Sequence, residues 1–265
     1  MSILFFDIDN TLFSHKTFTI PDSTRKALEL AKANGHILML ASGRGKTGLM
    51  EFFDRNLFDG AICASGAYII WQDEIILEQA IPQPYVRPLI QLAQAHDTGL
   101  SVQGKNENWL SESVLDRIRH NENMEAFRRR RNILTLQEYN DEPVYKFDFF
   151  FPNLEQANAL IRELPQELTI CPLLGDVGRG SGCEVSPAGV TKGAAIRSLL
   201  AWLNIDRRES YGFGDSENDL EMMEECGTGI AMGNATDGIK AAADYVTDDI
   251  EEDGIWNAMK HFHFI

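Results

Sequence analysis

The chain opens with an apolar segment, Ile3-Leu4-Phe5-Phe6, that runs directly into two acidic residues, Asp7 and Asp9. An uninterrupted apolar run is typical of a strand buried on both faces, as in a parallel sheet covered by helices. In an open α/β sheet, ligands bind beyond the carboxyl ends of the strands, which is where both carboxylates would then lie. Because neighbouring carboxylates repel each other and lose hydration, the pair predicts a divalent cation with oxygen ligands, and Mg²⁺ is the first candidate.

Helical and strand-like segments alternate along the chain, which predicts a Rossmann-like, doubly wound α/β core with a mostly parallel sheet. A helix is expected to begin at Pro21-Asp22-Ser23 and to end at Gly35, where a left-handed residue would cap it. The strand that follows delivers Ser42 and Gly43 to the same edge of the sheet as Asp7. The strands expected in this part of the chain lie at residues 3–6, 36–41, 61–64, 68–71 and 75–77.

Two prolines, Pro82 and Pro84, interrupt this alternation, since proline removes a backbone donor and restricts the residue before it. We therefore predict a core of residues 1–81 and 185–265 and an inserted α+β cap domain of residues 82–184. About 100 residues suffice for a separate hydrophobic core. The cap is expected to contain helices near residues 86–95, 114–131 and 154–164, and strands at 100–103, 144–151 and 168–171.

A second acidic cluster, Asp215-Ser216-Glu217-Asn218-Asp219, follows another strand-like segment at residues 210–214. A helix that begins after Asp215 would offer backbone N–H groups to an anion. Lys192 opens an earlier helix, and a lone lysine at such a place is usually solvated. Lys192 therefore indicates a function only in combination with the two acidic segments.

Charge and composition limit the partners of such a site. The 265 residues are 44% hydrophobic and include 40 acids against 24 bases, a net charge of −16. This charge argues against non-specific binding to nucleic acid or to an anionic membrane surface. No stretch approaches the roughly 18 apolar residues of a membrane span, and no signal-peptide pattern is present, so we expect a cytoplasmic protein. The cysteine spacing predicts reduced thiols rather than disulfides or zinc ligands at Cys63, Cys171, Cys183 and Cys226.

Four segments, taken together, resemble the four motifs of the haloacid dehalogenase-like hydrolase superfamily, in the family's order. They are Asp7-Ile8-Asp9-Asn10-Thr11, Ser42, Lys192 and Gly214-Asp215-Ser216-Glu217-Asn218-Asp219. The insertion and the segments at 231–235 and 243–247 are similar to the Cof-like phosphatases of that superfamily. The resemblance implies an Mg²⁺-dependent phosphatase that hydrolyses a small phosphorylated metabolite, such as a sugar phosphate, nucleotide or cofactor phosphate.

The resemblance also implies a role for each matched residue. Asp7 would be the nucleophile that forms an aspartyl-phosphate, and Asp9 would be the general acid and base. Lys192 would offset charge on the phosphoryl group and on Asp7, while Ser42 and Gly43 would bind phosphate oxygens. The metal would be held by the side chains of Asp7 and Asp215 and by the backbone carbonyl of Asp9. Further support for the metal, its waters and the substrate would come from Asp219 and Asn218.

Some assignments have structural alternatives. Ser42 could cap a helix instead of binding phosphate. Arg179, in the glycine-rich segment 178–182, could bind an anionic or polyhydroxyl substrate in the cap, but a solvated hairpin explains it equally well. Two positions depart from the family pattern: Asn10 replaces a glycine at a turn, and Ala64-Ser65-Gly66 replaces an Asn-Gly pair, so Ser65 bears on specificity.

Other activities fit parts of the same pattern. A phosphomutase uses a similar core and cap, and the motifs do not separate water from a sugar hydroxyl as the acceptor. A phosphoacceptor signalling domain would bind Mg²⁺ and store the aspartyl-phosphate, but it gains nothing from a hydrolytic acid at Asp9. A dehalogenase is disfavoured because a halide leaving group needs no acid.

Overall fold

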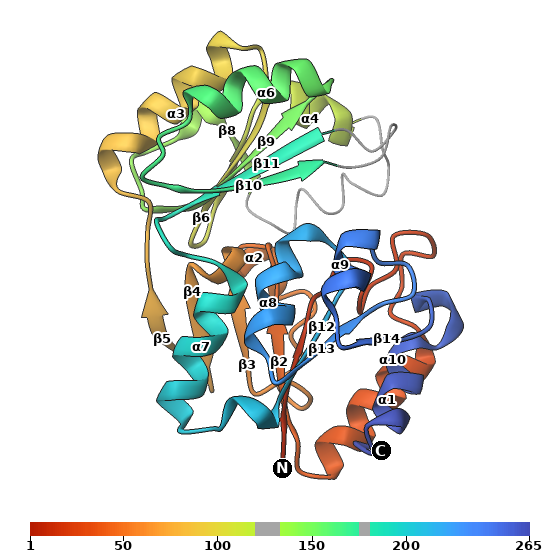
Figure 1. The fold of residues 1–265 in the computed structure, drawn as a ribbon. Helices are drawn as coiled ribbons and strands as arrows, with labels where there is room; N and C mark the ends of the chain where they lie inside the picture. Colours follow the sequence, from red (N-terminus) through yellow and green to blue (C-terminus); the bar gives the residue numbers. More distant parts are fainter. Residues whose placement is uncertain (120–132, 175–180) are drawn as a thin grey trace. The chain divides into compact units, whose positions relative to one another are not determined.

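The computed structural model describes residues 1–119, 133–174 and 181–265 and is drawn in Figure 1. Contacts divide the chain into two compact units. Unit 1 comprises Met1–Gly43, Phe52–Glu78 and Thr191–Ile265, and unit 2 comprises Arg44–Glu51 and Gln79–Val190. Independent folding of residues 82–184 stays a prediction. Among the described residues, no helix is long and apolar enough to cross a membrane.

Unit 1 is built on an eight-stranded sheet in the order β14-β13-β12-β1-β2-β3-β4-β5. Strand β1 (Ile3–Phe6) lies between β12 (Ser210–Gly214) and β2 (Ile37–Ala41) and runs parallel to both. All four of its side chains are fully buried, as the apolar run predicts. The remaining strands are β3 (Gly60–Cys63), β4 (Tyr68–Trp71), β5 (Glu74–Glu78), β13 (Thr228–Ala231) and β14 (Tyr245–Val246). Only β4 and β5 run antiparallel to their neighbours, so the predicted mostly parallel sheet is confirmed.

Helices cover both faces of this sheet. The chain passes from β1 through α1 (Asp22–Ala33) to β2 in one direction, and from β12 through α8 (Leu220–Glu225) to β13 in the other. Because such crossovers are right-handed, α1 and α8 lie on opposite faces. Helix α10 (Gly254–His261) packs with α1, and α7 (Lys192–Leu203) packs with α8 (Figure 1). Helix α9 (Asp237–Ala242) follows β13. The predicted end of α1 is confirmed, since Gly35 has a φ of +83°.

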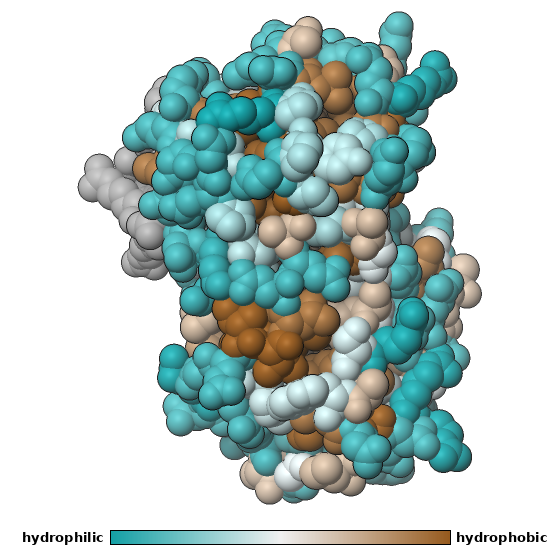
Figure 2. All heavy atoms as spheres, turned by 90° about the vertical axis from the view of Figure 1, so that its left-hand side faces the viewer, coloured by the Kyte–Doolittle hydropathy of each residue, from teal (hydrophilic) through white to brown (hydrophobic). Residues whose placement is uncertain are grey.

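Strand β5 is one of the two outermost strands of the unit 1 sheet. Figure 2 shows apolar side chains gathered on the side of the molecule where β5 and α7 lie. The indole of Trp202 in α7 is 56% exposed and meets Trp71 at 6.2 Å between ring centroids. Exposed Glu74 and Glu78 stand at the two ends of β5, and charges on an edge strand discourage pairing with another chain.

Unit 2 contains a six-stranded sheet in the order β10-β11-β9-β6-β7-β8, in which only the β7–β8 pair is parallel. Its strands are β6 (Gly99–Gly104), β7 (Asn108–Leu110), β8 (Ile133–Thr135), β9 (Val144–Phe151), β10 (Thr169–Leu174) and β11 (Ser181–Ser186). The helices among its described residues are α2 (Lys46–Leu49), α3 (Gln83–Ala95), α4 (Glu112–Arg119) and α6 (Leu154–Glu163). Side chains alternate along β9, so Phe147, Phe149 and Phe151 join the core that includes residues of α3 and α6.

Unit 2 differs from the sequence-based expectations at two places in the described residues. Helix α3 begins at Gln83, earlier than predicted, because proline is tolerated in the first turn of a helix, where Pro84 lies. In the glycine-rich segment 178–182, Ser181 and Gly182 belong to β11, which pairs antiparallel with β10. Arg179 and the predicted helix beyond residue 119 lie outside the described residues.

Candidate active site

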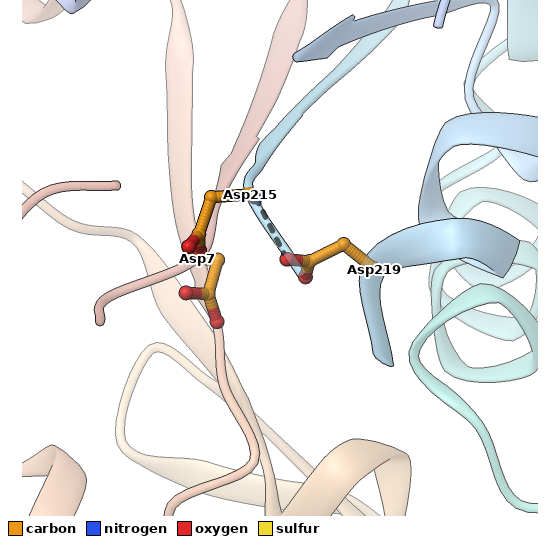
Figure 3. Close-up of side chains that lie close together, drawn as sticks. All are labelled: Asp7, Asp215 and Asp219. Carbon is orange, nitrogen blue, oxygen red and sulfur yellow. Dashed lines mark hydrogen bonds between the residues drawn. The ribbon is translucent and has the colours of Figure 1, made fainter. Parts of the chain in front are cut away.

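Asp7 and Asp215 meet at one edge of the unit 1 sheet. Asp7 follows β1, its backbone N–H donates to Phe213 O at 2.9 Å, and its side chain is buried. Asp215 follows the parallel neighbour β12, so the two carboxylates emerge side by side (Figure 3). The hydroxyl of Thr11 donates to Asp215 Oδ1 at 3.3 Å. One carboxylate oxygen each from Asp7, Asp215 and Asp219 lie within 4.8 Å of one another.

Lys192 lies among these carboxylates. It is the first residue of α7, whose N-terminus is capped by the Thr191 side chain accepting from Ala194 N. The Lys192 ammonium donates to Asp7 Oδ1 and to Asp219 Oδ1, both at 2.6 Å. Its side chain is 0% exposed, so the interpretation as a solvated lysine is excluded.

Both carboxylate oxygens of Asp219 accept hydrogen bonds from other groups of the protein. Its Oδ1 accepts from Lys192, and its Oδ2 accepts the backbone N–H groups of Asp215 at 3.0 Å and Ser216 at 3.2 Å. Figure 3 shows the bond to Asp215 as a dashed line. A helix that begins after Asp215 was predicted to offer backbone N–H groups to an anion, and the N–H groups of Asp215 and Ser216 are instead bonded to Asp219. A Cβ at Gly214 would lie 2.5 Å from Asp219 Cγ, which explains the glycine before Asp215.

The electrostatics of the cluster favour a bound cation. One ammonium against three carboxylates leaves two negative charges uncompensated among Lys192, Asp7, Asp215 and Asp219. Burial, together with the charges of Asp219 and Asp9 and against the opposing charge of Lys192, raises the pKa of Asp7 to about 7. Burial, followed by the charge of Asp7, raises the pKa of Asp215 well above its usual range. Burial would lower the pKa of Lys192, but the charges of Asp219 and Asp7 outweigh it and raise that pKa.

The donor set fits a divalent metal. Asp7 and Asp215 present hard carboxylate oxygens to each other, and a doubly charged ion would match the uncompensated charge. Both oxygens of Asp219 are already hydrogen-bonded, so this residue is better suited to holding Lys192 and the loop than to binding the metal directly.

Asp9 lies apart from the three-carboxylate cluster. Its side chain is 35% exposed, and its Oδ1 lies 2.6 Å from His15 Nε2. The turn after Asp9 is formed by Asn10, whose φ of +57° confirms that asparagine adopts the left-handed conformation there. His15 was not identified from the sequence, and the only available signal was a histidine six residues after Asp9. The carboxylate of Asp9 is therefore not part of the three-carboxylate group.

Ser42 follows β2, which lies beside β1, and its side chain is 1% exposed. Its backbone N–H donates to Ile62 O at 2.9 Å, and its carbonyl accepts from Ser65 N at 3.1 Å. Ser42 does not cap α2, because Gly45 occupies the N-cap position of that helix. Gly43 comes next in the chain. The alternative that Ser42 is a helix cap is therefore wrong, and the site keeps a hydroxyl at the edge where Asp7 lies.

Asn218 turns its side chain toward the lysine. Its Oδ1 accepts from Lys192 Nζ at 3.3 Å and from Ser216 Oγ at 3.1 Å. Asn218 therefore lies beside the reacting centre expected from the sequence.

Comparison with known proteins gives a consistent result. Residues 4–259 match the family model described as haloacid dehalogenase-like hydrolase. The chain is 25% identical to the 5-amino-6-(5-phospho-D-ribitylamino)uracil phosphatase YcsE of Bacillus subtilis, over 99% of this chain and 96% of that protein. It is 26% identical to the pyridoxal phosphate phosphatase YbhA of Escherichia coli, over 96% of this chain and 95% of that protein. The solved structure of the HAD subclass IIB sugar phosphatase BT4131 is similar with a TM-score of 0.83, 32% identity and full coverage of both chains.

Proposed function

Because the chain belongs to the haloacid dehalogenase-like hydrolases, we propose that it is an Mg²⁺-dependent phosphatase acting on small phosphomonoesters. The observation that carries the proposal is the buried arrangement of Asp7, Lys192 and Asp215. A nucleophilic carboxylate needs a cation beside it to accept a second anion, and Lys192 supplies one at 2.6 Å. Phosphatase relatives that span nearly the whole chain support the same reaction class.

In the proposed reaction, Asp7 attacks phosphorus. Lys192 holds Oδ1 of Asp7, which leaves Oδ2 as the attacking oxygen. The new bond joins Asp7 to phosphorus while the bond from phosphorus to the ester oxygen breaks. Bound Mg²⁺, held by Asp7 and Asp215, would reduce the repulsion between the carboxylate and the phosphate.

Asp9 moves the proton in both halves of the reaction. As an acid it gives a proton to the departing ester oxygen, and as a base it takes a proton from the water that hydrolyses the aspartyl-phosphate. His15 Nε2 lies 2.6 Å from Oδ1 of this carboxylate and would hold its orientation. Ser42 and the Gly43 backbone N–H would donate to the phosphate oxygens, and Asn218 would support Lys192 and the substrate.

The test is phosphate release from acetyl phosphate, sugar phosphates, nucleotides and cofactor phosphates, with Mg²⁺ or with EDTA. We expect metal-dependent release that Asp7→Asn abolishes. The matched control is Asp97→Asn, the same chemical change in an exposed turn with a φ of +48°, which asparagine also tolerates. Release that survives Asp7→Asn, or that is insensitive to EDTA, would contradict the proposal. Phosphate transferred to a sugar hydroxyl rather than to water would identify a phosphomutase instead.

A further inference from the structure

The loop that follows β13, residues 232–236, is bonded to the backbone of the candidate active site. Residues 231–235 are similar to the Cof-like phosphatases, yet the proposed reaction gives them no role. Met232 N donates to Gly214 O, and Thr236 N donates to Asp215 O, both at 3.0 Å. This loop therefore holds the chain at the point where it leaves β12.

The side chain of Asn234 connects the same loop to the turn after β1. Its Oδ1 accepts from Ile250 N at 2.9 Å, and its Nδ2 donates to Asn10 O at 2.8 Å. Because the oxygen of an amide accepts and its nitrogen only donates, the bond from Ile250 fixes which way the amide faces. The donor side is therefore directed at Asn10, the residue after Asp9. Since β12 lies between β13 and β1 in the sheet, Asn234 joins loops that follow strands two places apart.

Gly233 permits the close approach that this arrangement needs. Its N–H donates to Asp248 O at 2.9 Å, and a Cβ at residue 233 would lie 2.4 Å from Asp249 N and 2.6 Å from Asp248 C. A larger residue would push the loop away from this backbone. Glycine at this position therefore keeps Asn234 Oδ1 within reach of Ile250 N.

Asp9 lies between two fixed points of the backbone. Before it, the N–H of Asp7 is bonded to β12 at 2.9 Å. After it, Asn10 N donates to Phe13 O at 2.8 Å, and Asn10 O accepts from Asn234. Asn10 has a φ of +57°, and a residue other than glycine keeps such a conformation when surrounding contacts hold it. Loss of the bond from Asn234 would therefore release the backbone that carries Asp9.

Resting on the proposed phosphatase function, we propose that Asn234 is a positioning residue that acts through Asn10 on Asp9. The amide of Asn234 holds the Asn10 carbonyl, and the turn at Asn10 then holds the Asp9 carboxylate where it gives its proton to the departing ester oxygen. A positioned acid contributes about 10²–10⁴-fold to a rate, and a misplacement of about 1 Å removes much of this.

The contribution of Asp9 as an acid depends on the leaving group. An alkoxide is a strong base and needs a proton as it departs, whereas 4-nitrophenolate leaves without one. The value of kcat/KM includes only the steps up to the first irreversible one, which here is formation of the aspartyl-phosphate. A misplaced Asp9 therefore lowers kcat/KM for a sugar phosphate more than for 4-nitrophenyl phosphate. A smaller fraction of folded protein lowers both values equally.

The experiment compares wild type, Asn234→Ala and Asn234→Asp on 4-nitrophenyl phosphate and on the sugar phosphate that the wild-type protein hydrolyses fastest. We expect kcat/KM for the sugar phosphate to fall about tenfold more than kcat/KM for 4-nitrophenyl phosphate in both variants. Aspartate accepts from Ile250 N as asparagine does but has no N–H for Asn10 O. The aspartate variant therefore keeps the contact with Ile250 and tests the bond to Asn10 by itself.

Asn257→Ala is the matched control. Asn257 Nδ2 donates to Asp248 Oδ2 at 2.8 Å and to Glu252 O at 3.3 Å, so this variant loses amide bonds to the same segment that Asn234 contacts. Neither of these bonds involves Asn10, and the ratio of the two kcat/KM values should stay at its wild-type value. A change of the ratio in Asn257→Ala as large as that in Asn234→Ala would overturn the inference.

A second measurement does not depend on turnover. In the turn after β1, Phe13 N donates to Ile8 O at 2.7 Å and Asn10 N donates to Phe13 O at 2.8 Å. Hydrogen exchange of these two amides should be about tenfold faster in both Asn234 variants than in wild type and Asn257→Ala, because the turn opens more often without its bond to residue 234.

Equal losses of kcat/KM for the two substrates, or unchanged exchange at residues 8–13, would overturn the inference. A wild-type protein that releases no phosphate from any compound would instead contradict the proposed function, and the exchange measurement would still show whether Asn234 holds the turn at Asn10.

Discussion

Replacement of Lys192 by methionine is expected to destabilise unit 1 strongly. The lysine side chain is completely buried, and its ammonium lies 2.6 Å from the carboxylates of both Asp7 and Asp219. Methionine has a similar length but carries neither the charge nor the three N–H donors. Removing one partner of a buried ion pair costs about 3–5 kcal/mol because it leaves an uncompensated charge. We expect a loss of that size in the free energy of unfolding at pH 8 in EDTA.

The loss of unfolding free energy caused by Lys192→Met should increase with pH. Without Lys192, the folded-state pKa of Asp7 rises further above its unfolded value of 3.8. A carboxyl with a raised pKa in the folded state is stabilising at low pH, and that contribution is lost as pH rises toward the folded-state value. Lys192→Met should therefore be less destabilising at pH 5 than at pH 8.

Urea unfolding followed by tryptophan fluorescence measures the free energy of unfolding at each pH, since Trp71, Trp202 and Trp256 all lie in unit 1. Lys26→Met, at an exposed position of α1, is the control and should change stability by less than about 0.5 kcal/mol. A double-mutant cycle with Asp219→Asn should give a coupling energy of about 1–3 kcal/mol. The argument would be refuted if Lys192→Met lowered the free energy of unfolding by less than about 1 kcal/mol at every pH and its effect were additive with that of Asp219→Asn.

Three further outcomes are expected. Gly66→Ala should lower the unfolding free energy by more than about 2 kcal/mol, because residue 66 has a φ of +110° and a Cβ would lie 2.2 Å from Thr191 O. Gly35→Ala, at a φ of +83° with no atom within 4 Å, should lower the unfolding free energy by only about 1 kcal/mol. Equal melting temperatures of Gly66→Ala and Gly35→Ala would contradict a steric clash at residue 66. Burial raises the pKa of Cys226 from 9.0 to about 12, so the folded state keeps a proton that the unfolded state loses. Stability should fall between pH 9 and 12 by up to about 1.4 kcal/mol per unit, and a slope that Cys226→Ala leaves unchanged would exclude this thiol as its cause. His15→Ala should lower kcat about tenfold with little change in KM, and His15→Gln should restore part of it; a change confined to KM would show that His15 does not position Asp9.

Local patterns account for the elements that were predicted correctly. The apolar run at 3–6, the strand-like segment at 210–214, the cap at Gly35 and the strand at 144–151 each depend on neighbours in the chain. Strand β7 has only three residues and was not predicted. The helix α3 was predicted, but its start was placed too late because its prolines favour a break in isolation.

The order of residues along the chain specifies which chemical groups reach the carboxyl ends of the strands in the core sheet. Asp7, Ser42 and Asp215 each follow a strand, and parallel strands end at one edge, so their order along the chain was enough to bring them together. A strand and the residue after it are neighbours in the chain, so both can be predicted from the local sequence.

The contacts that each group makes at that edge depend on how distant segments pack together. Lys192 is 185 residues from Asp7 in the chain, and its burial between two carboxylates depends on where α7 packs. The same applies to Asp219, whose oxygens are taken by the loop and the lysine, and to Asp9, which turns to His15. Burial and hydrogen-bond partners arise from packing between distant segments, and such contacts leave no periodic or local pattern in the sequence.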